Sequence, residues 1–310
     1  MKHIIITSLA ASAALVSFAA WDSSVEDQVA CQLNGKDVWR FCHNSETATK
    51  SFFDPLRVAD GPSLTWARPA DHVWHYGLWF SWKFINSVNY WEETGGKSDG
   101  TTRASSVVVK MNNNDSATVT MSLDYFPKGK ENETVLTEQR TIDISAPAED
   151  GSYFMDWTMT LTAYVDVKFD RTPIPGEPNG MSWGGYSGLS MRFADGMKDT
   201  QTISTAGRVQ RNKDDRLDTT AAAVEQNGIF ADGKPYGVAI LAHPSNPRAP
   251  GDWYSLEDGH FTFFNAAFLL KAPYTLAKGE TLTLRYRVHI HSGRWDAEKL
   301  NQAQTDYSNK

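Results

Sequence analysis

Runs of alternating apolar and polar residues, separated by short turn signals, dominate this 310-residue sequence. The clearest run is Thr281–His291, in which every second residue from Leu282 to Val288 is apolar. A period of two residues predicts a half-buried strand. Similar β-branched runs occupy 105–110, 118–126 and 134–145, and 152–169 reads as one long strand. The pattern predicts an all-β fold, a large antiparallel β-sandwich formed by residues 21–310 as a single domain, with a short helix near 297–307.

The N-terminal segment Met1–Ala20 has a basic start, an apolar stretch and small residues at its end. This is the pattern of a secretory signal peptide, and it predicts a periplasmic or secreted protein. No later stretch has the apolar length of a membrane span. The full chain has 37 acidic and 30 basic residues, and loss of Lys2 with the signal leaves a net charge near −8. An acidic chain offers no basic stripe, so we expect no nucleic-acid partner.

Two cysteines, Cys31 and Cys42, flank a turn signal centred on Asn34-Gly35. In an oxidising compartment a bond across such a hairpin is the expected arrangement. Metal ligation is the alternative, with His43 as the nearby partner. The sequence therefore predicts a structural disulfide.

Histidines, aromatic residues and acids are concentrated between Asp71 and Glu93, in the stretch DHVWHYGLWFSWKFINSVNYWEE. Asp71–Gly77 reads as a loop, and Leu78–Phe84 reads as a strand. Residues three apart point to opposite faces of a strand but can converge on a loop, so His72 and His75 can share a site only if the strand begins after them. An aromatic platform with a few polar groups is typical of a sugar site. The alternative is that the tryptophans are sandwich core and the histidines have structural roles.

A second segment with several candidate functional side chains is Ala242–Tyr254, AHPSNPRAPGDWY. His243 ends a buried-type strand, and two prolines hold the following residues extended. Asn246 and Arg248 are thereby presented on a stiff loop, where arginine can bind a carboxylate or vicinal hydroxyls through two nitrogens. A proline-rich surface loop with an incidental histidine is the alternative. We expect this segment and Asp71–Glu93 to meet in one cleft.

The motif order resembles that of the secreted PmoA-like family, whose members occur in bacterial polysaccharide-degrading lineages and have essentially unassigned function. The resemblance covers about Phe53 to His291 and rests on F-x-P-L, D-H-x-x-H-x-G-L-W-F, W-E, G-L-S-M-R, H-P-S-N-P-R-x-P-x-x-W and G-E-T-L-x-L-R-Y-R. The first motif departs from the family, which usually has two adjacent histidines followed by arginine. The resemblance implies an all-β sandwich in a carbohydrate-processing setting, and the mutarotase-like supersandwich is one fold of this kind. The matching positions are His72, His75, Gly77, Trp79, Trp91, Glu92, Arg192, His243, Asn246, Arg248 and Trp253.

These features favour an exported carbohydrate-active enzyme that cleaves a glycosidic linkage of an oligosaccharide or polysaccharide, by β-elimination in preference to hydrolysis. In elimination from a uronate, arginine or asparagine neutralises the carboxylate and histidine or tyrosine takes the C5 proton; a keto glycoside would suit the same groups. A hydrolase needs two opposed carboxylates, which adjacent Glu92 and Glu93 cannot supply, although Asp71 could be one partner. The catalytic candidates are His72, His75, Tyr76, His243 and Arg248, and the substrate-binding candidates are Trp74, Trp79, Asn86, Trp91, Glu92, Arg192, Asn246 and Trp253.

Two further hypotheses remain open. The first is a metal-dependent sugar enzyme, with a divalent ion such as zinc held by His72, His75 and His243 together with Glu92. The second is a non-catalytic carbohydrate-binding protein that uses the tryptophans alone. The preferred hypothesis requires no cofactor.

Overall fold

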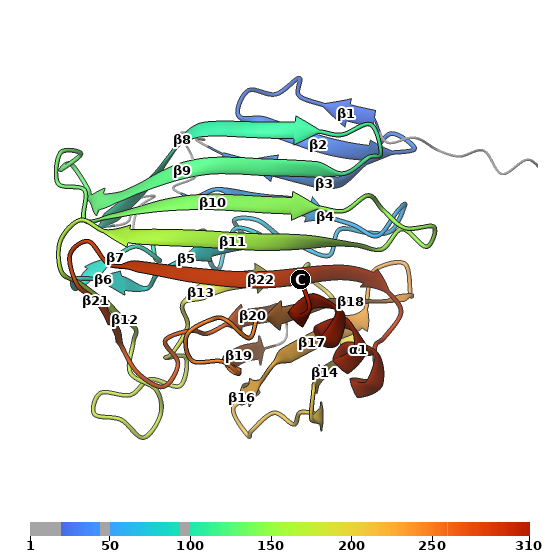
Figure 1. The fold of residues 1–310 in the computed structure, drawn as a ribbon. Coiled ribbons are helices and arrows are strands. Elements are labelled where there is room, and N and C mark those ends of the chain that lie inside the picture. Colours follow the sequence, from blue (N-terminus) through green and yellow to red (C-terminus); the bar gives the residue numbers. More distant parts are fainter. Residues whose placement is uncertain (1–19, 44–49, 94–98, 259) are drawn as a thin grey trace, which may run out of the picture.

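Two large β-sheets stacked face to face make up the protein (Figure 1). The computed structural model describes residues 20–43, 50–93, 99–258 and 260–310. Neighbouring strands pair antiparallel in both sheets, so the predicted all-β antiparallel sandwich is confirmed. The predicted signal peptide falls almost entirely on residues 1–19, which lie outside the described residues.

The sheet nearer the viewer in Figure 1, here called the front sheet, has nine strands within the described residues. Their spatial order is β15 (Gly207–Arg208), β14 (Lys198–Ser204), β17 (Ala223–Ile229), β18 (Pro235–Ala242), β22 (Thr281–Ser292), β11 (Tyr153–Ala163), β10 (Leu136–Ile144), β9 (Ala117–Pro127) and β8 (Gly100–Met111).

The sheet behind it, here called the back sheet, also has nine strands in this part of the chain. Their order is β1 (Ala20–Asp22), β2 (Gln28–Leu33), β3 (Lys36–Cys42), β4 (Phe52–Leu56), β5 (Leu78–Ser81), β13 (Gly188–Arg192), β20 (Phe261–Ala266), β19 (Gly251–Asp258) and β16 (Arg216–Ala221). A small sheet lies at one end of the sandwich and contains β21 (Tyr274–Leu276), β12 (Val167–Asp170), β6 (Phe84–Ile85) and β7 (Val88–Asn89).

The main core lies between the two large sheets and follows the strand alternation of the sequence. In β11 the buried residues Trp157, Met159 and Leu161 point inward, and threonines lie between them. The facing strands of the back sheet contribute Phe80 and Phe264 to the same core. Burial of one apolar face per sheet is the interaction that holds such a sandwich together.

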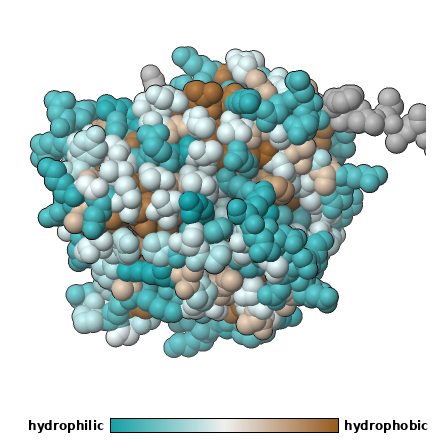
Figure 2. Space-filling model, viewed as in Figure 1, coloured by the Kyte–Doolittle hydropathy of each residue, from teal (hydrophilic) through white to brown (hydrophobic). Residues whose placement is uncertain are grey.

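The outer faces of the two sheets differ: a helix packs on the front sheet, and an aromatic cluster lies on the back sheet. On the front sheet, Ala223, Ala239 and Leu241 point outward and pack against Leu300 and Tyr307 of the helix α1 (Ala297–Ser308). The rest of this face is mostly hydrophilic or near neutral in Figure 2, with hydrophobic residues in separate small groups. On the back sheet a second aromatic cluster points outward, and the functional cavity described below is built on it.

Most of the expected strands are present, but two of them are interrupted. The runs at 105–110, 118–126 and 134–145 lie in β8, β9 and β10, and Thr281–His291 lies in β22. The expected long strand 152–169 divides into β11 and β12 at residues 164–166, and Leu78–Phe84 divides into β5 and β6. The expected terminal helix is α1, capped by the side chain of Asp296, which accepts a hydrogen bond from the backbone N–H of Lys299. No helix in the described part of the chain is long and apolar enough to cross a membrane.

The predicted disulfide is wrong. Cys31 lies opposite Trp39 in the β2–β3 pairing, whereas Cys42 lies opposite Gln28. The two cysteines are therefore offset by three residues, or about 10 Å along the strands, which exceeds the Cα separation that a disulfide can bridge. They also face different sides, because Cys31 belongs to the main core and Cys42 to the outer cluster of the back sheet. Burial raises the pKa of each thiol to about 12.

We predict that both cysteines are free thiols and that neither reacts with an alkylating agent while the protein is folded, because both are buried. Intact mass after alkylation without reductant should show no label in buffer and two labels in denaturant. A cross-linked peptide containing Cys31 and Cys42 would contradict the observed register.

Candidate functional site

The loop before β5, residues 66–77 and here called the histidine loop, brings two histidines together. The backbone N–H of His72 donates to the Pro69 carbonyl at 3.0 Å, and that of His75 donates to the His72 carbonyl at 2.9 Å. These turns place the two imidazole rings 4.7 Å apart, measured between centroids. Since β5 begins only at Leu78, the condition that the strand starts after both histidines is met.

Aromatic rings form the floor on which these histidines rest. Alternation along the back sheet sends Leu78, Trp253 and Phe264 into the main core and their neighbours Trp79, Tyr254 and Phe263 outward. His75 stacks on Phe263 with the centroids 5.1 Å apart and also contacts Trp79 at 5.1 Å. Trp91 continues the floor to Tyr186, with a centroid distance of 4.8 Å.

An open cavity of about 1050 Å³ lies over this floor, and we refer to it as the outer cavity. Aromatic side chains make up much of its wall. Its lining residues are Trp66, Ala70, Asp71, His72, Trp74, His75, Trp91, Glu92, Trp183, Tyr186, Arg192, Asp195, Tyr254, Leu256, His260, Phe261 and Phe263.

One side of the outer cavity carries a linked arginine, aspartate and histidine. Oδ2 of Asp71 lies 2.9 Å from Nη2 of Arg192 and 2.9 Å from Nδ1 of His72. Partial burial alone would raise the pKa of Asp71, but the hydrogen bonds from His72 and Arg192 outweigh it and lower the pKa. Asp71 is thus held as a carboxylate, and it orients the imidazole of His72 by accepting its Nδ1–H.

His75 differs from His72 in burial. Only 4% of His75 is exposed, whereas 35% of the His72 side chain is exposed. Burial lowers the pKa of His75 well below 6.5, and the nearby His72 and Arg192 lower it further. His75 therefore remains neutral near pH 7, and His72 is the imidazole that is more accessible from the cavity.

The other side of the outer cavity is held by Glu92. Its carboxylate pairs with Lys83 and accepts hydrogen bonds from the Tyr186 hydroxyl and from Nδ2 of Asn89, the latter at 2.8 Å. Burial alone would raise the pKa of Glu92, but the charge of Lys83 outweighs it and lowers the pKa. Burial and the negative charge of Glu92 raise the pKa of Tyr186 well above 10.

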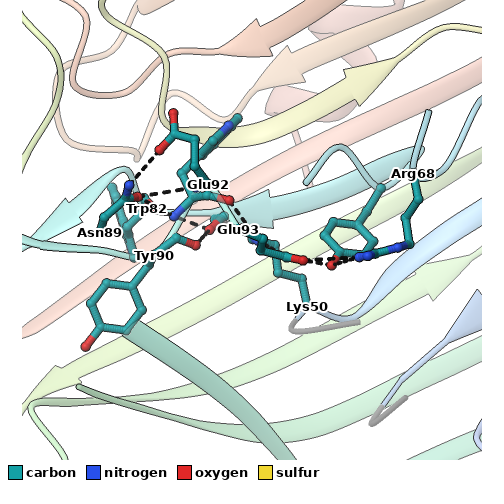
Figure 3. A network of polar contacts seen from close by, with 10 residues as sticks. Lys50, Arg68, Trp82, Asn89, Tyr90, Glu92 and Glu93 are labelled. Atoms are coloured by element: carbon teal, nitrogen blue, oxygen red, sulfur yellow. Dashed lines mark hydrogen bonds and ion pairs between the residues drawn. The ribbon is translucent and has the colours of Figure 1, made fainter. Parts of the chain in front are cut away.

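The next residue, Glu93, bonds two residues of the histidine loop through its buried carboxylate. Its Oε1 lies 3.0 Å from Nζ of Lys50 and 2.5 Å from the hydroxyl of Tyr76, and its Oε2 lies 3.1 Å from Nη1 of Arg68. Figure 3 shows the two carboxylates turned away from each other, Glu92 toward Asn89 and Glu93 toward Lys50 and Arg68. Adjacent acids thus fix two different parts of the site.

The structure divides the residues that the sequence singled out. Those that line the outer cavity are His72, Trp74, His75, Trp91, Glu92 and Arg192. Trp79 is fully buried beneath the floor, and Tyr76 is fully buried with its hydroxyl bonded to Glu93. Asn86 lies away from the cavity, in the turn between β6 and β7, where its side chain bonds the backbone of Asp166 and Lys168.

The prediction of one shared cleft is wrong for the second segment. His243 packs against Tyr307 of α1, on the outer side of the front sheet, and bonds Ser245. The histidine loop lies on the outer side of the back sheet, so the sandwich separates His243 from His72 and His75.

The other members of that segment have structural partners. Asn246 bonds the backbone of Arg285 in both directions. Arg248 donates to the carbonyls of Phe268, Ala272 and Pro273. Trp253 lies in the main core with its indole N–H on the Ala221 carbonyl. Tyr254, the last residue of the segment, does reach the outer cavity.

This separation also rules out the three-histidine metal set of His72, His75 and His243, since no ion could contact both sides of the sandwich. Within the described residues, no three histidine, cysteine or acidic side chains come together in a way that could hold a metal ion.

Sequence reasoning missed several cavity residues that come from other segments. These are Trp66, Trp183, Tyr186, Asp195, Leu256, His260, Phe261 and Phe263. The alternating aromatic run Phe261-Thr262-Phe263-Phe264 was a usable signal for an aromatic sheet face. Which face of this sheet is open to solvent depends on how distant strands pair, and local sequence patterns do not predict that pairing.

Comparison with family models gives one match: a model described as a family of unknown function (DUF6807) covers residues 28–305. No curated protein matches the sequence. The PmoA-like resemblance is not addressed by these comparisons and stays a prediction.

Several solved structures are similar at low identity. A GH36 α-galactosidase of Geobacillus stearothermophilus is 9% identical with a TM-score of 0.44, and the match covers 89% of this chain and 41% of that one. An α-galactosidase of Lactobacillus brevis is 9% identical with a TM-score of 0.46, covering 89% and 40%. A galactose mutarotase related enzyme of Lactobacillus acidophilus is 8% identical with a TM-score of 0.44, covering 83% and 96%. The chain thus spans about two fifths of the length of these α-galactosidases.

We predict that Gly77, which ends the histidine loop, cannot be replaced without cost. Its φ is +70°, and an added Cβ would lie 2.5 Å from the Phe53 carbonyl oxygen. Gly279 has a similar φ of +86° but open space around it. Both Gly→Ala variants should lose about 1–2 kcal/mol from the left-handed conformation, and Gly77→Ala should lose about 1–3 kcal/mol more from the clash. Urea unfolding measures both, and equal losses would contradict the tight approach of the loop to β4.

Proposed function

The chain belongs to the DUF6807 family, and we propose that it is an enzyme that binds a saccharide in the outer cavity and cleaves a glycosidic linkage by proton transfer at His72. The observation that carries the proposal is the position of the Asp71–His72 pair beside a floor of aromatic rings in a large open cavity. The pattern of the N-terminal segment Met1–Ala20 supports action outside the cytoplasm.

The aromatic floor suits a sugar ring. The apolar C–H face of a pyranose stacks on an aromatic ring, and its hydroxyls need polar partners at the edges of that ring. Trp74, Phe261 and Tyr186 line the cavity and are partly exposed, so they can supply ring faces, whereas Trp91 and Phe263 are almost fully buried. Polar groups flank them on both sides, with His72 and Asp71 on one side and Glu92 and Tyr186 on the other.

His72 has the properties of a general base. Its Nδ1 donates to Asp71, so the unprotonated nitrogen is Nε2. Nη2 of Arg192 donates to the same oxygen, Oδ2 of Asp71, which keeps the carboxylate ionised and in place. A carboxylate that orients an imidazole in this way also stabilises the imidazolium that forms when Nε2 takes a proton.

Hydrolysis by two carboxylates fits the site less well. That mechanism needs one carboxyl group with a raised pKa to protonate the leaving oxygen. Asp71 and Glu92 both line the cavity, and the pKa of each is lowered, in spite of burial, by the cationic and hydrogen-bonding partners it has. Neither is suited to be the proton donor, so we favour elimination.

In the proposed elimination, Nε2 of His72 takes the proton from a sugar carbon next to a carbonyl group. The electron pair of that C–H bond becomes a C=C bond, and the C–O bond one carbon further on breaks. The departing oxygen takes a proton from water, and the His72 imidazolium then returns its proton to the solvent.

We predict that His72→Ala lowers turnover by roughly a hundredfold or more, as expected for loss of a general base. The melting temperature should change little, because the side chain is partly exposed. The control is His243→Ala, which removes a histidine on the far side of the sandwich and should leave turnover unchanged.

The assay is a panel of neutral, acidic and oxidised (keto) oligosaccharides, read by the ultraviolet absorbance of a new double bond and by reducing ends. Reducing ends without absorbance would replace elimination by hydrolysis. Binding without either product, or equal turnover of His72→Ala and wild type, would contradict the enzyme proposal and favour a non-catalytic carbohydrate-binding protein.

A further inference from the structure

Building on the proposed saccharide function, we infer that the ligand of the outer cavity is an uncharged oligosaccharide of more than one sugar ring, and that Trp183 binds the ring at the mouth. Three features of the cavity carry this inference: the pairing of its charges, its size, and the support of Trp183.

Carboxylates outnumber guanidinium groups at the outer cavity. Arg192 is the sole lysine or arginine among the described lining residues, and its Nη2 is committed to Asp71. Lys83, which lies behind the wall, is committed to Glu92. Asp195 lies 2.8 Å from Nδ1 of His260. The lining thus contains three carboxylates and one guanidinium.

An anionic sugar would meet an excess of carboxylates in this cavity, and the one lining guanidinium, that of Arg192, is already paired with Asp71. A desolvated carboxylate or sulfate with no counter-charge is strongly disfavoured, and the neighbouring carboxylates would add repulsion. A neutral sugar needs only hydrogen bonds and aromatic faces, both of which are present. For the proposed elimination, the acidifying carbonyl is therefore the ketone of an oxidised neutral glycoside and not the carboxylate of a uronate.

The size of the outer cavity indicates several sugar rings. Its volume of about 1050 Å³ is at the upper end of ligand pockets, which hold drug-sized molecules in about 300–1,000 Å³. The aromatic residues extend from Phe263 at the floor, through Tyr186, to Trp183. The rings of Trp183 and Tyr186 are 6.2 Å apart and inclined by 31°, which gives successive faces for successive sugars.

Trp183 is exposed but its backbone is fixed. Trp183 is 40% exposed, and contact with water is unfavourable for so large an apolar side chain. Nη1 of buried Arg216 donates to the carbonyls of Ser182 and Gly184, at 2.8 and 2.7 Å, on both sides of Trp183. A tryptophan held in this way loses little conformational entropy when a sugar stacks on it, so its exposure is suited to binding.

The test compares Trp183→Ala with Met181→Ala. Met181 lies in the same loop and is 41% exposed, but it does not line the cavity. The probes are cello-, xylo-, manno-, malto- and galacto-oligosaccharides of one to six rings, with oligogalacturonides of the same lengths as the charged counterparts. Affinity is measured by calorimetry, which requires no turnover.

For at least one neutral series we expect affinity to rise with chain length. In that series Trp183→Ala should bind the longest members roughly fivefold to tenfold more weakly, as loss of one aromatic contact predicts, and the monosaccharide as wild type does. Met181→Ala should match wild type throughout. Oligogalacturonides should bind more weakly than the neutral sugars of equal length.

Tighter binding of oligogalacturonides would overturn the uncharged class. Equal affinity for one and six rings, or a Trp183→Ala variant that matches wild type on the longest chains, would overturn the subsite. In both cases the proposed function would stand. If no saccharide bound at all, the proposed function would fall together with this inference.

Discussion

Two neighbouring carboxylates, Glu92 and Glu93, hold the two sides of the outer cavity in place. Glu93 is 1% exposed at its side chain and bonds Lys50, Tyr76 and Arg68, so it ties the histidine loop to the segment that precedes β4. Glu92 faces the other way and holds Tyr186. Removal of one partner from a buried ion pair typically costs 3–5 kcal/mol, because the other charge is left without compensation. The polypeptide is therefore strongly constrained to keep these segments together, and the separation of the two sides follows from two adjacent residues that point in opposite directions (Figure 3).

The location of the cavity follows from how the sandwich is covered. Each large sheet has an inner face in the main core and an outer face that must be either polar or covered. The front sheet is covered in part by α1, and its remaining outer surface is largely hydrophilic (Figure 2). The back sheet instead carries an outward aromatic cluster that is itself buried, and the outer cavity lies over it between loops that include β4–β5 and β12–β13. Folding alone does not require an aromatic-lined cavity on the outside of a sandwich, whereas ligand binding does explain it.

Local sequence pattern was sufficient for the strands and for the histidine loop, but not for the arrangement of the sheets. The alternation in β22 and the turn-like residues before β5 depend on neighbours in sequence, and both were predicted from it. Whether Cys31 and Cys42 face each other depends on strand register, and a shift of one residue moves a side chain to the other face. His243 resembled a site residue because it ends a strand beside prolines. Its strand, β18, lies in the front sheet, and only the pairing of distant strands decides that.

The outer cavity, and not the proline-rich loop that joins β18 to β19, is where we expect the protein to bind its ligand. Hydrogen exchange measured by mass spectrometry, with and without the tightest-binding neutral oligosaccharide, tests this claim most directly. We expect slower exchange in residues 66–76 and 183–192, which contain cavity-lining side chains, and unchanged exchange in 243–249. Protection confined to 243–249, with no change around the cavity, would contradict it.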